Sequence, residues 1–233
     1  MRAMVLNGSP HRSEGSTGRL SGALIDGMRS AGAHVEVLHV YDLEVEGCRG
    51  CFSCWIKAAG SCVIRDDMDR VLPRARDSKI LVLATPVYCD GMTGPTKMVV
   101  DRMIPLVYGS AELRDGHMRH PQREDTALRT LVLVSTCGFV ERDNFDPLIQ
   151  HTRAIAANMG LAWGGCLTLP GGLKRGALDE IGPAAREAGE ELVRTGMIPE
   201  HLEAAMLGHS VSAMDAVTFL NRRFQEPEDK AKV

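Results

Sequence analysis

The chain has 233 residues, of which 44% are hydrophobic and 24% are charged, and its formal net charge is −3. This length and composition can bury one sizeable core, and they argue against a disordered chain. Acidic and basic residues are mixed without a broad basic face, so nucleic acid is not expected as a partner. No apolar run is long enough for a membrane span or a signal peptide, and we expect a cytoplasmic protein without a membrane partner.

Apolar runs alternate with helical patterns, which is typical of a parallel sheet covered by helices on both faces. The expected strands are residues 2–6, 34–40, 79–84, 128–135 and 165–169. The expected helices are residues 16–31, a segment capped by Asp66 and Asp67 that ends near Ala75, residues 95–103, residues 146–159, and two or three helices from about residue 177. The polar stretch 108–125 is too long for an ordinary connection and is expected to be a lid or interface loop.

These elements predict a doubly wound five-stranded α/β fold with a C-terminal helical extension. We place the ligand-binding domain at residues 1–175. The extension then covers residues 176–233, and we expect it to pack on the same domain or on a partner subunit.

Three turns with small and hydroxyl-bearing residues follow strands of the expected sheet. They are residues 7–17 after the first strand, residues 85–88 after the third, with Gly91 close behind, and residues 135–139 after the fourth. Because such a sheet binds ligands at the carboxyl ends of its strands, we expect one site built from three segments. Backbone N–H groups and hydroxyls in the first turn suit a phosphate, and the small turns suit a flat heteroaromatic ring.

The sequence lacks the motifs of several other ligand-binding and catalytic sites. A Walker A loop needs Gly-x-x-x-x-Gly-Lys-Ser/Thr, and a dinucleotide fingerprint needs Gly-x-Gly-x-x-Gly; the chain contains neither. The Gly-x-Ser-x-Gly elbow of hydrolases and the His-Glu-x-x-His motif of zinc proteases are absent as well. The remaining alternative is that residues 8–18 form only a strand-to-helix turn.

Two motifs carry a resemblance to a known family. They are Leu-Asn-Gly-Ser-Pro at residues 6–10, continued by Arg12, Ser16 and Thr17, and Ala-Thr-Pro-Val-Tyr at residues 84–88. Over about residues 2–169 the chain resembles the NAD(P)H-dependent FMN reductases of the flavodoxin-like superfamily. The resemblance implies a flavodoxin-like fold, FMN as cofactor and NAD(P)H as co-substrate. The implied FMN phosphate contacts are Ser9, Arg12, Ser16 and Thr17, and the implied contacts at or near the flavin ring are Pro86, Val87, Tyr88, Gly91, Thr136 and Gly138.

A compact cysteine motif follows the second expected strand: Cys48, Cys51 and Cys54, with Cys62 eight residues further on. Three cysteines at this spacing can converge on one centre, and the fourth completes a thiolate set for an iron–sulfur cluster or zinc. The pattern resembles the iron-sulfur flavoproteins, in which such a motif binds a [4Fe-4S] cluster near FMN. Two other interpretations stay open, namely reduced thiols that pack a loop or an interface, and a zinc site or disulfide.

Other candidate residues receive structural interpretations. His117 and His120 could ligate a metal, but their polar, arginine-rich surroundings favour solvated side chains. Asp101 and Arg102, near the end of an expected helix, are interpreted as salt-bridged or capping residues. Trp55 is interpreted as a packing residue.

The resemblance implies an oxidoreductase that transfers hydride from NAD(P)H to FMN and on to a small-molecule electron acceptor such as a quinone or a free flavin. No side chain is assigned as a catalytic acid or base, because FMN carries the chemistry. The alternative is an iron-sulfur flavoprotein that carries electrons between protein partners. A homodimer or homotetramer is expected, because a second subunit usually completes the flavin site in this family.

Overall fold

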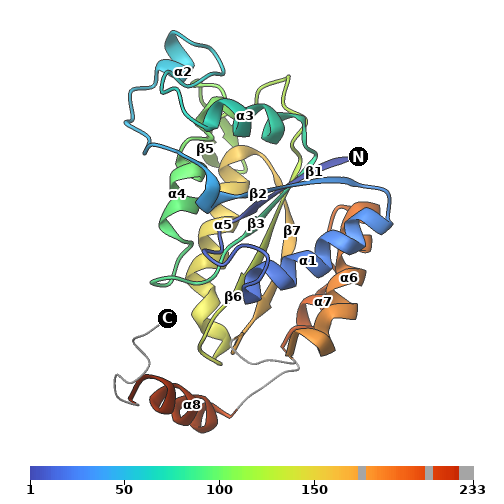
Figure 1. Cartoon of the computed structure of the whole chain (residues 1–233). Coiled ribbons are helices and arrows are strands. Elements are labelled where there is room, and N and C mark those ends of the chain that lie inside the picture. Colours follow the sequence, from blue (N-terminus) through green and yellow to red (C-terminus); the bar gives the residue numbers. More distant parts are fainter. Residues whose placement is uncertain (173–176, 208–211, 226–233) are drawn as a thin grey trace.

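The computed structural model describes residues 1–172, 177–207 and 212–225 (Figure 1). Its centre is a five-stranded sheet in the order β2-β1-β3-β6-β7, and all neighbouring strands run parallel. The strands are β1 (Arg2–Asn7), β2 (His34–His39), β3 (Ile80–Ala84), β6 (Thr130–Thr136) and β7 (Ala162–Leu169). This is the strand order of flavodoxin-like folds, and it confirms the predicted doubly wound sheet.

Helices cover both faces of the sheet (Figure 1). One face carries α1 (Ser16–Ser30), α6 (Ala177–Thr195) and α7 (Glu200–Ala205), and the other carries α3 (Met68–Asp77), α4 (Gly94–Asp101) and α5 (Asp146–Met159). Two further helices are α2 (Ser53–Ile56) and α8 (Ala213–Gln225), and short 3-10 turns lie at Val40–Asp42, Ile104–Leu106 and Arg142–Phe145. Every helix within the described ranges is too short or too polar to cross a membrane.

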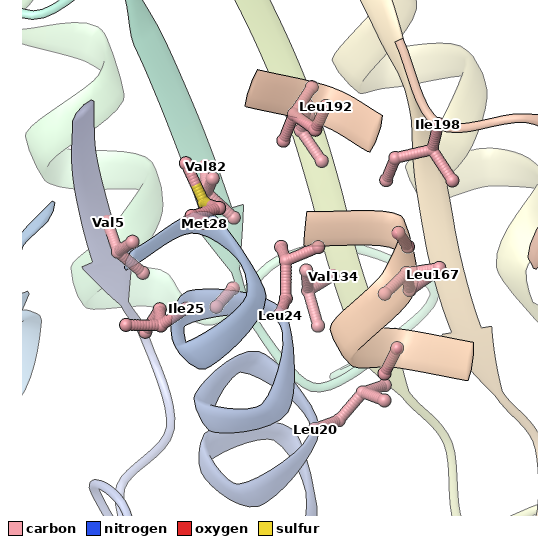
Figure 2. Close-up of a cluster of buried hydrophobic side chains, with 14 of the residues drawn as sticks. Val5, Leu20, Leu24, Ile25, Met28, Val82, Val134, Leu167, Leu192 and Ile198 are labelled. Atoms are coloured by element: carbon pink, nitrogen blue, oxygen red, sulfur yellow. The ribbon is translucent and has the colours of Figure 1, made fainter. Parts of the chain in front are cut away.

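The core has one layer on each side of the sheet. In Figure 2, Leu20, Leu24 and Met28 point from α1 toward the strands, and they are fully buried there. Helices α1 and α6 touch backbone to backbone, because a Cβ on Gly27 would lie 1.8 Å from the carbonyl oxygen of Arg186. Since both faces are covered, the central strands β1, β3 and β6 are largely apolar and buried, which is why the sequence pattern located them.

The helical extension begins after a segment that the structure does not describe. The predicted boundary between residues 175 and 176 lies outside the described residues. After it, Ile181, Ala185 and Leu192 of α6 are buried in the same core cluster as α1. The division into a domain and an extension therefore stays a prediction, and the described part of α6 belongs to the central core.

Three local features differ from the predicted elements. The last strand begins at Ala162 rather than at residue 165, and a register shift against β6 accommodates Gly165 at φ 101°. The polar stretch 108–125, expected to be a lid or interface loop, contains a short hairpin of β4 (Glu112–Arg114) and β5 (His117–Arg119). The cysteine segment contains the single-turn helix α2.

Candidate functional site

The loop after β1 is held in shape by its own polar groups. The Ser9 backbone N–H donates to Asn7 Oδ1 at 2.9 Å, and Asn7 Nδ2 donates to the carbonyl oxygen of Arg12 at 3.2 Å. The backbone N–H of His11 donates to Ser9 Oγ at 3.3 Å. Asn7 and Ser9 are both buried. These internal hydrogen bonds therefore fix much of the shape of the loop.

This loop delivers the chain to the start of α1. Gly15 is the N-cap, and within the described residues no side chain caps the helix and no acidic residue lies in its first turn. The first N–H groups of a helix lack intrahelical partners and lie at the positive end of its dipole, which favours an anion. The loop backbone lies directly on the helix, because a Cβ on Gly18 would be 1.9 Å from the carbonyl oxygen of Arg12.

Hydroxyl groups at the start of α1 join it to the ends of β6 and β7. Thr17 Oγ1 and Thr136 Oγ1 are 2.7 Å apart, and both residues are buried. The Ser16 hydroxyl donates to the carbonyl oxygen of Gly172. Gly172 in turn donates its N–H to the carbonyl oxygen of Cys137 at 2.9 Å. The turn after β7 is thus a fourth part of the site, and the paired glycines 171 and 172 after a strand were its unused sequence signal.

The turn after β3 is bonded to the turn after β6. The backbone N–H of Val87 donates to the carbonyl oxygen of Thr136 at 2.9 Å. The Ser135 hydroxyl donates to the carbonyl oxygen of Thr85 at 2.7 Å, and both residues are buried. These two turns therefore lie side by side, as the sequence predicts.

The start of α4 connects the first loop to the turn after β3. The Thr93 hydroxyl donates to the carbonyl oxygen of Gly8 at 3.1 Å and lies 2.8 Å from Thr96 Oγ1. The backbone N–H of Gly8 donates to the carbonyl oxygen of Ala84 at 2.7 Å. Sequence analysis did not assign Thr93 a role, although a threonine just before Gly-Pro is a recognisable helix start.

A tight turn projects Tyr88 beside this cluster. Tyr88 and Gly91 exchange backbone hydrogen bonds of 2.9 and 3.1 Å. Cys89 and Asp90, between them, both have positive φ, at 46° and 62°. The Tyr88 side chain is 49% exposed, and Phe139, on the turn after β6, is 59% exposed. Two aromatic faces at the edge of a polar cluster provide surfaces on which a flat ring can stack.

Arg12 is the predicted phosphate contact whose side chain is bonded to a residue outside the candidate site. Its Nε lies 2.9 Å from Asp42 Oδ1, and its Nη2 also contacts this carboxylate. The hydrogen bond from Arg12 lowers the pKa of the exposed Asp42 carboxyl group. The other residues predicted around FMN gather at the carboxyl ends of the strands: Ser9, Ser16, Thr17, Pro86, Val87, Tyr88, Gly91, Thr136 and Gly138. The Arg12 guanidinium instead ties the first loop to the segment after β2.

The four clustered cysteines line a second site. Cys48, Cys51, Cys54 and Cys62 border one pocket, which Arg102 also borders, and all four thiols are free. Burial, followed by the nearby Cys62, raises the pKa of Cys54. Within the described ranges no group of three or more His, Cys, Asp or Glu side chains is arranged to hold a single metal ion. The four cysteines therefore border one common pocket without three of them meeting at a single-ion site.

Trp55 anchors the cysteine segment to the body of the protein. Its Nε1–H lies 3.0 Å from the carbonyl oxygen of Val107 and 3.3 Å from that of Ile104. Its ring stacks on Phe52 at a centroid distance of 5.1 Å and contacts the His120 ring at 4.7 Å. Trp55 is thus a packing residue, as interpreted from the sequence, and what it fixes is the loop that carries the cysteines.

Arg102 is buried in an ion pair beside these cysteines. Its side chain is 1% exposed and that of Asp66 is 8% exposed, and Nη1 lies 2.8 Å from Asp66 Oδ2. Burial opposes the charge on Arg102, but the hydrogen bond to Asp66 and the nearby Cys62 thiol outweigh it, so that the pKa of Arg102 is raised. Arg102 is salt-bridged, as predicted, and Asp101 pairs with Lys97 at 2.6 Å.

The two sites lie at opposite ends of α4. Thr93 precedes the helix and contacts Gly8 in the first loop, whereas Arg102 follows it and contacts the cysteine segment. Eight residues of α-helix span about 12 Å. Figure 1 shows α2, within the cysteine segment, far from the start of α1.

Comparison with known proteins agrees with this geometry. The sequence profile of the NADPH-dependent FMN reductases matches residues 1–131, which is more than half of the chain. The chain belongs to this family. The first loop, the turn after β3 and the cysteine segment all lie within the matched region.

Relatives of the chain include iron-sulfur flavoproteins. One from Archaeoglobus fulgidus is 35% identical over 105 residues, which are 45% of this chain and 46% of that protein. One from Methanocaldococcus jannaschii is 34% identical over 109 residues, which are 47% of this chain and 55% of that protein. The chain thus spans about half the length of these curated relatives. The NAD(P)H:quinone oxidoreductase of Methanothermobacter marburgensis shares the fold, with a TM-score of 0.62 and 19% identity over 82% of this chain and 96% of that one.

Proposed function

We propose that the chain binds FMN at the turns after β1, β3, β6 and β7 and acts as an NAD(P)H-dependent oxidoreductase. In this proposal hydride passes from NAD(P)H to FMN and on to a quinone, a free flavin or a similar small acceptor. The observation that carries it is the uncapped start of α1, enclosed by hydrogen-bonded turns, in a member of the NADPH-dependent FMN reductase family.

The start of α1 is proposed to hold the FMN phosphate. The backbone N–H groups of Ser16, Thr17 and Gly18 lie in the first helical turn, where anions are stabilised. The hydroxyls of Ser16 and Thr17 are used in bonds to other turns, so these residues contribute mainly through their backbone. Ser9 supplies a buried hydroxyl, and Arg12, held by Asp42, places a positive charge at the rim.

The turns after β3 and β6 are proposed to hold the flavin ring. The N–H groups of Val87 and Tyr88 are used within the turns, so Gly138 and the Val87 carbonyl group are proposed to face the polar edge of the ring. Tyr88 and Phe139 offer stacking surfaces. FMN, when bound, supplies the hydride acceptor, and the protein supplies orientation and oriented dipoles. No side-chain acid or base is part of this proposal.

Steady-state kinetics of the FMN-loaded protein test the proposal. NAD(P)H and a quinone are varied together, and parallel double-reciprocal lines are expected because the nicotinamide leaves before the acceptor binds. Anaerobic addition of NADPH or NADH is expected to bleach the flavin absorbance and shows which nucleotide is preferred. A bound flavin that neither nucleotide reduces contradicts the proposed activity.

A second candidate function is electron transfer between proteins by FMN together with a [4Fe-4S] cluster. The specific observation that favours it is the pocket lined by all four clustered cysteines. Four thiolates are the usual ligands of such a cluster. About four iron atoms per chain and a broad visible absorption in anaerobically purified protein are expected for this candidate. Iron-free protein with full NAD(P)H turnover contradicts it.

The proposal also covers the oligomeric state and the cellular location of the protein. Tyr88 and Phe139 are exposed at the flavin site, and a second subunit in a homodimer or homotetramer is proposed to cover them. Exposed thiols at Cys48, Cys51 and Cys89 suit a reducing compartment, and we propose the cytoplasm. Light scattering of the FMN-loaded protein measures the oligomer.

A further inference from the structure

Arg102 joins the two ends of the cysteine segment. Its Nη1 donates to the carbonyl oxygen of Glu46 at 2.7 Å, and its Nη2 lies 3.3 Å from the carbonyl oxygen of Ile64. These carbonyl groups belong to residues two positions before Cys48 and two positions after Cys62. One side chain from the end of α4 therefore holds both stems of the loop that carries the four cysteines.

Asp66 fixes the orientation of this guanidinium. Its two carboxylate oxygens accept from Nη1 at 2.8 Å and from Nη2 at 3.1 Å, and Asp66 Oδ1 also accepts from the backbone N–H of Met68 at 3.0 Å. The contact uses both arms of the guanidinium fork, a geometry that lysine cannot reproduce. The orientation of Arg102 is thus set by contacts on the side of Asp66.

The third nitrogen atom of the Arg102 guanidinium, Nε, has no hydrogen-bond partner among the described residues. Its Nε is buried, and no hydrogen-bond acceptor is found for it among the described residues. An orphaned buried N–H costs free energy, so such groups usually serve a ligand or another function. Arg102 borders the pocket that the four cysteines also border, and Cys62 is close enough to contribute to its raised pKa.

The chemistry of the pocket fits a group larger than one metal ion. Four cysteine thiolates would bring four negative charges, and a buried cation with an unused donor compensates part of that charge. All four cysteines border this pocket, and within the described residues no three of them are arranged to hold a single metal ion. A four-iron cluster is several atoms wide, so its ligands need not meet at one point, and its sulfur atoms accept hydrogen bonds.

We propose that Arg102 is a positioning residue for an iron–sulfur cluster held by the four clustered cysteines, and that its Nε–H donates a hydrogen bond to a sulfur atom of that cluster. The proposal rests on the second candidate function. A donated hydrogen bond favours the more negative, reduced form of the cluster, because hydrogen bonds to cluster sulfur set the reduction potential. Arg102 therefore holds the loop stems and also raises the potential of the cluster.

The test is a redox titration of the cluster by electron paramagnetic resonance in FMN-loaded, iron-reconstituted protein. The variants are Arg102→Lys, which keeps the charge but loses Nε–H, and the double variant Arg102→Gln with Asp66→Asn, which avoids a buried unpaired charge. At the wild-type midpoint potential, the ratio of reduced to oxidised cluster is expected to fall about tenfold in both, equal to about 59 mV for a one-electron couple.

Arg49→Gln is the matched control. Arg49 borders the same pocket, but its side chain is 68% exposed and it pairs with Glu46 at the surface. Removal of this solvated charge is expected to change the ratio less than about twofold, since water and salt screen it. A shift in Arg49→Gln as large as that in Arg102→Lys overturns the hydrogen-bond assignment, because the loss of a solvated surface side chain would then have the same effect as the loss of the buried Nε–H donor.

Iron and FMN contents separate the remaining outcomes. Loss of iron with full FMN in the Arg102 variants supports the positioning role. If both variants keep the wild-type iron content and cluster reduction potential, the proposal for Arg102 is overturned, but the presence of a cluster is not. If the wild-type protein binds FMN but no iron, this result contradicts both the second candidate function and this inference. Loss of FMN together with iron in both variants also overturns it, because Arg102 would then support the whole fold.

Discussion

The two ends of α4 carry sites that are built in different ways. At its start, the turns after the strands are joined by backbone groups, a glycine and buried hydroxyls such as Thr17 and Thr136. At its end, a few long side chains, above all Trp55 and Arg102, hold the cysteine segment. The first site follows from the fold of the sheet, whereas the second depends on contacts that can be removed one at a time. The two sites should therefore be separable by mutation.

The largest effect is expected for Gly18→Ala at the start of α1. The new Cβ would lie 1.9 Å from the carbonyl oxygen of Arg12, so the first loop must move off the helix. We expect a loss of about 3 kcal/mol in the free energy of unfolding, measured with urea, and a large loss of FMN affinity. Gly22→Ala is the control on the same helix, because no atom of the described residues crowds its Cβ position within 4 Å. It is expected to stabilise by about 0.5–1 kcal/mol. Wild-type FMN affinity in Gly18→Ala contradicts the assigned phosphate site.

Trp55→Ala is expected to loosen the cysteine segment and leave the flavin site intact. The substitution removes two hydrogen bonds and the stacking on Phe52 and His120. Local opening should become easier by about 2 kcal/mol, seen as faster protease cleavage within residues 43–67. Phe52→Ala, which removes only one of these ring contacts, should have a smaller effect. A parallel loss of FMN affinity in Trp55→Ala would show that the two sites are coupled.

The pair of Thr17 and Thr136 provides a smaller test of the first site. Both hydroxyls are buried and 2.7 Å apart, so replacing one threonine by valine leaves the other without its partner. In a double-mutant cycle on the free energy of unfolding, we expect a coupling of about 1 kcal/mol. The double valine variant should be more stable than the two single effects predict. Additive effects would mean that the bond does not join α1 to β6.

The rate of thiol modification should differ between the exposed and the buried cysteines of the unmutated protein. Burial raises the pKa of Cys166 to about 12, so its thiol stays protonated at any pH below that and alkylates slowly. The backbone hydrogen bond from Ser53 lowers the pKa of the exposed Cys51, so its thiolate forms at lower pH. Mass spectrometry of iron-free protein treated with iodoacetamide should find Cys51 modified early and Cys166 last. Early modification of Cys166 would contradict its burial in the core layer on the α5 side of the sheet.

The central strands β1, β3 and β6 could be predicted because their residues are largely apolar on both faces. The start of β7 was misplaced because Gly164 and Gly165 look like a break, whereas the sheet accommodates them with a register shift. The hairpin of β4 and β5 was missed although Asp115 and Gly116 form the kind of dipeptide that favours a two-residue turn. The local sequence indicated both the start of β7 and the hairpin, but a glycine is compatible with more than one kind of backbone structure.

The positions of the candidate site were predicted better than its contacts. Turns at the ends of neighbouring parallel strands must lie together, so strand order predicted that the turns proposed for the flavin are neighbours. The partners of Arg12 and Arg102 could not be predicted in this way. Asp42 and Asp66 lie 30 and 36 residues away from them along the chain, and only the tertiary fold selects these carboxylates. Charged side chains on loops have many possible partners, whereas buried strands have few.

The central claim is that the start of α1 holds the phosphate of FMN. Isothermal titration of the flavin-free protein with FMN and with riboflavin tests it, because the two ligands share the ring and differ in the phosphate. Two charge-assisted hydrogen bonds from the helix start predict about a hundredfold tighter binding of FMN. Equal affinity for the two flavins, or no binding of FMN, would contradict the account.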